Sequence, residues 1–373
     1  AAHLPTNGSW AYTSAGSPWF GSTGDVARRY PAAKDGVGNA ITDDITYTWS
    51  SALRGRFPSN DNAWWSYDAN SHTLTLGTDS GSNKIVTEFE TSATSRVLPW
   101  HKAGIIRAHT TGSNNTWTGR YVTSIIINGR LAPMNLAFWF AGYTDVTNIN
   151  ASGMDISQVL LSPTGTLSST FAGDTALATL NLTGWNWTAS TPHDLMLANL
   201  PSISSITLDK VAVLEGTGFG NGADGVTPLS SRVTTVGHWT MDSNSADTPW
   251  FDCTQQLIAR YGADKSATFN FGAESGVTKT LTQIISTTHT YTWASGVRGR
   301  FPSNLYAWWT FVNGVLTIGV EQNAPDKTVS EYDGTMQYML ADGTLAPTSS
   351  LTLPWLAPIN GKTKITSVAT QNS

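Results

Sequence analysis

The stretch that decides the fold is TYTWSSALRGRFPSNDNAWW, residues 46–65, because it occurs again as TYTWASGVRGRFPSNLYAWW at residues 290–309. The two copies match at 15 of 20 positions, with an offset of 244 residues. Their aromatic and β-branched residues favour strands. A separation this long indicates a duplicated module and not the short repeats of a solenoid.

The similarity continues on both sides of this stretch, and the offset changes between blocks. Pro18–Phe20 recurs as Pro249–Phe251, and Leu98–Trp100 recurs as Leu353–Trp355. Each change of offset is an insertion or deletion, which surface loops tolerate. The sequence therefore predicts a first β module at 1–150, a β-rich connecting segment at 151–235 and a second β module at 236–373.

Short apolar runs separated by Gly, Asn, Asp, Ser and Pro predict an all-β fold, with two related β-sandwich or jelly-roll modules from an internal duplication. Two short helices are expected, at 24–30 and at Thr254–Tyr261, and both follow a Pro-Trp-Phe element. The predicted strands are Thr46–Trp49, Thr73–Leu76, Tyr121–Ile127, Leu136–Phe140, Ala178–Thr183 and Ser205–Leu208.

The composition excludes several classes of protein. Charged residues make up 13% of the chain, against about 25% in an average protein, which argues against coiled coils and solvated helical bundles. A net charge of −5 without a basic tract argues against specific nucleic-acid recognition. No apolar run approaches the roughly 18 residues of a membrane span. The single cysteine, Cys253, excludes an intrachain disulfide and a cysteine-based zinc site.

The sequence contains little that indicates catalysis. Its seven histidines are scattered, none is shared by the two copies, and no nucleophile elbow or P-loop is present. The glycines of Gly216–Gly225 match a dinucleotide-binding spacing, but Pro228 follows where the helix should begin, so a β connection is expected. We therefore predict no enzyme activity, no catalytic residue, no metal and no cofactor.

The duplicated stretch supplies the candidate binding residues, and two interpretations compete. Tryptophan rings beside arginine and asparagine would form a platform for sugar rings. Alternatively, one tryptophan of each pair anchors the core, because neighbours in a strand face opposite sides, and the other contacts a glycan or another subunit. The candidates are Arg54, Arg56, Asn60, Trp64, Trp65, Arg298, Arg300, Asn304, Trp308 and Trp309.

The order of several landmarks resembles picorna-like jelly-roll capsid proteins, in particular the two-domain large coat protein. In that family a short Arg-rich helix precedes a Phe-Arg-Gly segment, and a Val-Pro-Tyr strand follows later. The parallels here are Ala27–Tyr30, Ala52–Phe57 and Val97–Trp100 in the first copy, and Ile258–Tyr261, Gly296–Phe301 and Leu351–Trp355 in the second. The resemblance implies a coat subunit with two jelly rolls.

Three functions follow from these observations. The first is a self-assembling structural protein, such as a viral capsid subunit or another particle or filament component, whose partners are itself and sister subunits. The second is a secreted glycan-binding protein with one Trp/Arg/Asn site per module, whose binding is expected to fall when Trp65 and Trp309 become alanine. The third is a β-rich carbohydrate hydrolase with a carboxylate pair. The first two place the protein in a virion or outside the cell.

Overall fold

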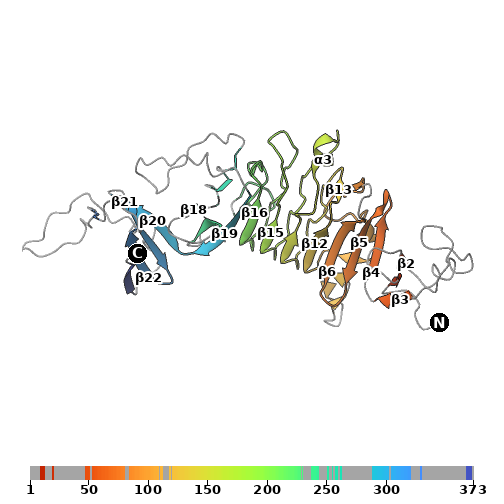
Figure 1. The fold of residues 1–373 in the computed structure, drawn as a ribbon, viewed down its shortest axis with the longest axis horizontal. Coiled ribbons are helices and arrows are strands. Elements are labelled where there is room, and N and C mark those ends of the chain that lie inside the picture. Colours follow the sequence, from red (N-terminus) through yellow and green to blue (C-terminus); the bar gives the residue numbers. More distant parts are fainter. Residues whose placement is uncertain are drawn as a thin grey trace, which may run out of the picture. The chain divides into compact units, whose positions relative to one another are not determined.

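The structure is a computed structural model, and its described residues form two compact units, Ala1–Leu229 and Ser230–Ser373. Strands dominate both units, so the predicted all-β class is confirmed (Figure 1). The described residues are 9–12, 19–20, 47–50, 53–79, 84–108, 110–111, 117–118, 120–227, 229, 237–242, 250–251, 254, 257–258, 261–262, 288–301, 304–320, 328–329 and 367–371.

The first unit begins with a three-stranded antiparallel sheet. Its central strand β1 (Ser9–Tyr12) pairs on one side with β2 (Trp19–Phe20) and on the other with β3 (Tyr47–Ser50). Trp10 lies opposite both Phe20 and Trp49. The strand predicted at the start of the repeated stretch is therefore present as β3.

Three longer antiparallel strands follow, β4 (Leu53–Phe57), β5 (Asn60–Asp68) and β6 (Thr73–Thr78). Burial alternates along β5, with Ala63, Trp65 and Tyr67 inside and the residues between them outside. This period of two is what a sheet with one buried face requires. The sheet therefore has an inner face against the core and an outer face toward solvent.

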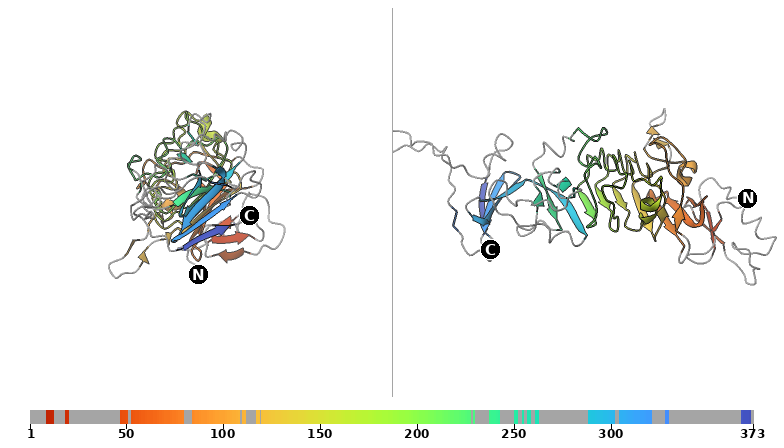
Figure 2. Two further views of the ribbon diagram at one scale, coloured as in Figure 1. Left: turned by 90° about the vertical axis from the view of Figure 1, so that its left-hand side faces the viewer. Right: turned by 90° about the horizontal axis from the view of Figure 1, so that it is seen from above.

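Beyond β6 the sheet continues with parallel strands. The order is β6, β12 (Ser124–Asn128), β14 (Asn148–Asn150), β15 (Thr179–Asn181) and β16 (Ser205–Leu208). One column of this ladder contains Ser124, Asn148, Thr179 and Ser205. Successive strands are therefore 24, 31 and 26 residues apart in the chain. Figure 2 shows the yellow and green coils of this part stacked on one another.

This part of the chain is a solenoid, an architecture that was not predicted from the sequence. Each coil contributes one apolar residue to an inner column that is fully buried, made of Leu74, Ile125, Ile149, Leu180 and Ile206. A single coil cannot bury its apolar side, and stacking gives the coils a continuous core. The domain boundary expected after residue 150 falls within this ladder, because β14 ends there between β12 and β15.

Buried aromatic residues fill the space between the sheet and the opposite wall of the solenoid. The rings of Phe140 and Phe171 stack with centroids 5.7 Å apart, and Trp185 lies 5.7 Å beyond Phe171. The strand predicted at Leu136–Phe140 is wrong, because these residues form turns, and Phe138 has a φ of 55°. Positive φ values also occur at Ser169, 31 residues after Phe138, and at Leu195, 26 residues after Ser169. These are the spacings of the ladder, so each of these coils turns at an equivalent position.

The segment between β6 and β12 packs against the first coil of the solenoid. It contains the short helix α2 (Pro99–Lys102), where Pro at the first position is compatible with a helix start. Trp100 of α2 packs edge-on against Phe57 and Trp139, at 5.9 and 5.6 Å between ring centroids. The other short elements of the first unit are β7 (Ile85–Val86), β8 (Ile105–Ile106), β9 (Thr110–Thr111), β10 (Trp117–Thr118), β11 (Arg120–Tyr121), β13 (Ala132–Pro133) and α3 (Ser157–Leu161).

The second unit begins with another three-stranded antiparallel sheet. Its strand β17 (Gly237–Met241) pairs with β18 (Trp250–Phe251) and with β19 (His289–Ser295). Trp239 lies opposite both Phe251 and Trp293. This is the register that Trp10 has with Phe20 and Trp49.

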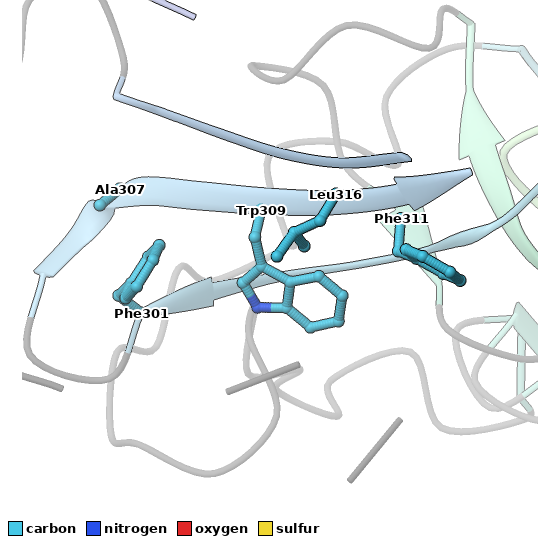
Figure 3. Packing of buried hydrophobic residues seen from close by; sticks show 5 residues of the cluster. All are labelled: Phe301, Ala307, Trp309, Phe311 and Leu316. Carbon is cyan, nitrogen blue, oxygen red and sulfur yellow. The ribbon is translucent and has the colours of Figure 1, made fainter. Parts of the chain in front are cut away.

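The remaining strands of the second unit also repeat the pairing of the first. The strands are β20 (Val297–Phe301), β21 (Asn304–Val312), β22 (Val315–Val320) and β23 (Ser367–Gln371), with β23 parallel to β22. They correspond to β4, β5, β6 and β12, and the register shift in the first hairpin falls at the same place in both. Figure 3 shows the core of this sheet, formed by Phe301, Ala307, Trp309, Phe311 and Leu316.

The two helices predicted from the sequence have different outcomes. Thr254, Leu257 and Ile258 are helical, and the Tyr261 N–H donates to the Leu257 carbonyl oxygen at 3.2 Å, as the prediction for this segment requires. The helix predicted at 24–30 lies outside the described residues, as does Cys253.

Candidate binding face

In each copy of the repeated stretch, both tryptophans of the adjacent pair, Trp64–Trp65 or Trp308–Trp309, lie against a glycine on the neighbouring strand. Trp65 pairs with Gly55 and Trp64 pairs with Gly77. A Cβ atom added to Gly55 would lie 2.5 Å from Nε1 of Trp65, and one added to Gly77 would lie 2.5 Å from Cζ2 of Trp64. Both rings therefore lie flat across a strand, and only glycine leaves room for them.

Trp65 and its counterpart Trp309 face the core. Their side chains are 4% and 2% exposed, and Trp309 lies over Gly299 as Trp65 lies over Gly55. The prediction that these two residues contact a ligand is wrong, because they are buried under the sheet. The expectation that one tryptophan of each pair anchors the core is confirmed.

Trp64 and its counterpart Trp308 are on the opposite face, and they differ in exposure. Trp64 is partly exposed on the outer face of the first unit, whereas Trp308, which lies over Gly319, is only 7% exposed. Among the two adjacent pairs, Trp64–Trp65 and Trp308–Trp309, Trp64 alone offers ring surface to a ligand. The two modules are therefore not equivalent as binding sites.

Two arginines share the outer face with Trp64. Arg56 pairs with Trp64 across the strands, and Arg54 pairs with Ser66. Arg56 Nη1 donates to Asp79 Oδ2 at 2.7 Å. Burial, followed by the nearby positive charge of Arg56, lowers the pKa of Arg54, although arginine stays charged at any ordinary pH.

The other predicted binding residues are not all on this face. Asn60 is 7% exposed, and its amide is engaged within the fold, since Nδ2 donates to the Ile85 carbonyl at 2.8 Å and Oδ1 accepts from the Asn62 N–H at 3.0 Å. Arg298 is 6% exposed. Arg300 and Asn304 belong to β20 and β21, but their side chains lie outside the described part of the structure.

Beyond Trp64, the outer face carries two rows of uncharged side chains that cross the strands from β6 to β16. Their members are related by the ladder and alternate with the buried column. Row 1 consists of Thr73, Ser124, Asn148, Thr179 and Ser205, and row 2 consists of Thr75, Ile126, Asn150, Asn181 and Thr207. Nine of these ten residues are Ser, Thr or Asn, and all of them are partly or fully exposed.

Two asparagines of row 2 end their strands in the same way. Oδ1 of Asn150 accepts from the Ser152 hydroxyl at 2.8 Å, and Oδ1 of Asn181 accepts from the Thr183 hydroxyl at 2.7 Å. The side chain thus replaces a backbone acceptor where the chain leaves the sheet. The same Asn-x-Ser/Thr pattern therefore marks the ends of β14 and β15.

A separate cluster of titratable groups is buried between α2 and the solenoid. Glu90 is fully buried and accepts hydrogen bonds from the backbone N–H groups of Val97 and Leu98, from the Ser95 hydroxyl and from His101. Burial alone would raise the pKa of Glu90, but these hydrogen bonds outweigh it and lower the pKa to about 2. The carboxylate is therefore ionised.

The hydrogen bonds of this cluster assign the proton on His101. Ionised Glu90 can only accept, so His101 Nδ1 carries the proton and donates to Glu90 Oε1 at 2.6 Å. In the neutral ring Nε2 is then an acceptor, and the Tyr143 hydroxyl, whose oxygen accepts the indole N–H of Trp100 at 2.8 Å, donates to it at 2.6 Å. Burial is the main cause that lowers the pKa of His101, which favours this neutral form. The cluster is enclosed, so it joins α2 to the solenoid and offers no surface to a substrate.

Comparison of the chain with protein-family models, with curated proteins and with solved structures finds no match. Within the described ranges, no group of three or more His, Cys, Asp or Glu side chains is placed to hold a metal ion. A search of the same residues finds no helix with the length and apolar character that a membrane crossing needs. The function is therefore argued from the outer face itself.

Proposed function

We propose that the protein binds glycans through the outer face of its first unit. The observation that carries the proposal is the partly exposed indole of Trp64, which lies flat on Gly77 beside Arg56 and borders two rows of uncharged polar side chains. A flat aromatic ring stacks on the apolar face of a sugar, and the surrounding donors and acceptors bind its hydroxyl groups. Binding without chemical turnover fits this arrangement.

The difference in exposure between Trp64 and Trp308 allows the proposed glycan site to be tested. Wild-type protein is incubated with insoluble cellulose, chitin, xylan and mannan and applied to a glycan array, alongside Trp64→Ala and Trp308→Ala. We expect at least one glycan to be bound, with binding lost in Trp64→Ala and retained in Trp308→Ala. Equal loss in both variants, with both folded by circular dichroism, would contradict a site at Trp64.

A second variant that preserves the fold distinguishes loss of the binding site from loss of structure. Trp64→Ala removes the cover of Gly77 and will lower stability, so Arg56→Gln serves as a second probe of the same face. Gln keeps a donor and much of the length of arginine but removes its charge and its fork of N–H groups. We expect weaker glycan binding with little change in the free energy of unfolding. Arg56 is partly exposed, and its ion pair with Asp79 contributes little to stability.

Self-assembly into a particle or filament, such as a viral coat, is the second candidate, and one observation favours it. The side chains from Ser367 to Thr370 of β23 are exposed, with Val368 at 61%. β23 pairs with β22 along one edge, and no strand among the described residues pairs with its other edge. An open strand edge is a template for pairing with another chain.

This second function is tested by light scattering and negative-stain imaging. Uniform shells or filaments that disappear in Ala369→Pro, which removes a backbone donor and disrupts the edge strand, are the expected result. A monodisperse species of 39.9 kDa across salt and pH would contradict self-assembly.

A further inference from the structure

We infer that the ligand of the outer face is a linear, neutral polysaccharide that lies across the strands, contacting Trp64 at one end and rows 1 and 2 along its length. This inference rests on the proposed glycan binding and specifies its ligand class. A chain internal to a polymer is recognised, and a terminal sugar is not sufficient.

The regular spacing of the rows is the first argument. Adjacent strands are about 4.8 Å apart, so each row presents a polar side chain at that interval from β6 to β16. From Trp64 on β5 to Thr179 on β15 there are four such steps, or about 19 Å. A ligand that uses the whole array must itself be extended and periodic, as a linear polysaccharide is.

The chemistry of the rows is the second argument. None of the ten residues is charged, and the side chains are of similar, small size. Rows 1 and 2 have donors and acceptors for hydroxyl groups. The two arginines of this face, Arg54 and Arg56, are on β4, beyond Trp64, and Arg56 is paired with Asp79. Ile126, 38% exposed within row 2, adds an apolar contact for the face of a sugar ring. The absence of charge along the rows themselves therefore favours a neutral chain.

The amide groups in row 2 are fixed in place by the fold. The carbonyl oxygens of Asn150 and Asn181 are held by Ser152 and Thr183, so both side chains have their orientation determined before any ligand binds. Groups that are already ordered lose little conformational entropy on binding. Repetition of this arrangement on successive coils gives equivalent contacts to successive sugars.

The test distinguishes two questions, whether the protein binds glycans at all and whether affinity depends on the length of the glycan. Oligosaccharides of β-1,4-linked glucose, mannose, xylose and N-acetylglucosamine, from one to six sugars long, are titrated by calorimetry. We expect affinity to rise about tenfold from two sugars to six, equivalent to ~1.4 kcal/mol. In Thr179→Tyr, whose new ring interrupts row 1 on β15, one strand before the rows end, the six-sugar ligand should lose most of its advantage over the two-sugar ligand.

One control variant, together with the pattern of binding, decides between the outcomes. Leu161→Tyr places the same ring on α3, at a position 75% exposed and outside the sheet, and should leave all affinities unchanged. If short and long oligosaccharides bind equally, or if Thr179→Tyr has no effect on the long one, the extended mode is wrong while glycan binding stands. If neither the oligosaccharides nor the parent polymers bind, the proposed function itself is wrong.

Discussion

Trp64 and Gly77 are paired across β5 and β6 so closely that a single methyl group on Gly77 would lie 2.5 Å from the Trp64 ring and 2.5 Å from the backbone oxygen of Asn128. The same relationship holds between Trp308 and Gly319. The outer face thus depends on a glycine under each ring.

The first prediction follows from this contact. Gly77→Ala should destabilise the protein by about 1–3 kcal/mol, the usual cost of overpacking, because the new Cβ meets rigid backbone as well as the ring. Gly222→Ala is the control, since its nearest neighbour would be 3.6 Å away and its φ is not in the left-handed region. Urea unfolding measures both, and equal stability of the two variants would contradict the packing described.

The second prediction concerns Asn181, whose Oδ1 accepts hydrogen bonds from the backbone N–H and the hydroxyl of Thr183. Asn181→Ala should cost about 1 kcal/mol, because it removes these bonds at the end of β15. Asn148→Ala, on the exposed column of β14, should change stability by less than about 0.5 kcal/mol. If Asn148→Ala proves the more damaging substitution, the role given to the turn is wrong.

The third prediction is that the protein becomes less stable as pH falls, because folding lowers the pKa of His101 and of Glu90. The pKa of His101 is lowered on folding, so the folded state binds fewer protons than the unfolded state once pH drops below about 6.5. Stability should therefore decline from there, and again below pH 4.5 as Glu90 approaches its pKa of about 2. Thermal unfolding of wild type and His101→Gln between pH 7.5 and 5 should show a shallower slope in the variant. The same slope in both would contradict a buried neutral histidine.

The fourth prediction is that Asp174 makes the protein less stable as pH rises, which is the opposite of the effect of His101 and Glu90. Asp174 is fully buried, its Oδ1 accepts the Tyr143 N–H at 2.7 Å, and its Oδ2 has no hydrogen-bond partner among the described residues. Burial raises the pKa of Asp174 well above its ordinary value, so the folded state holds a proton that the unfolded state releases. Stability is lost as pH rises from about 4 toward the folded pKa.

Asp174→Asn removes this titration and keeps the acceptor for Tyr143. We expect the variant to gain stability relative to wild type as pH rises, by about 1.4 kcal/mol for each pH unit between the unfolded and the folded pKa of Asp174. Unfolding curves at pH 4, 6 and 8 measure the difference. A gap that is constant with pH would show that Asp174 is ionised in the folded protein.

The repeated stretch allowed strands to be predicted from sequence, because alternation of buried and exposed residues is a local property of a strand. It also predicted that the two tryptophans of a pair face opposite sides. Which one faces the core depends on the register of β5 against its neighbours, and the sequence analysis selected Trp65 where the structure exposes Trp64.

The solenoid was missed for a physical reason. Its coils share one buried aliphatic residue, such as Ile149 or Leu180, and a polar turn, and their lengths vary, so no fixed period appears in the chain. The cluster of Glu90, His101 and Tyr143 depends on contacts 11 and 42 residues apart, which composition and local pattern do not encode.

Polysaccharide binding by Trp64→Ala beside Trp308→Ala decides whether the outer face of the first unit is the glycan site. The two substitutions remove the same ring from equivalent positions, and only Trp64 is accessible on its face. We expect Trp64→Ala to lose binding and Trp308→Ala to bind as wild type does. Undiminished binding by folded Trp64→Ala would show that the site lies elsewhere.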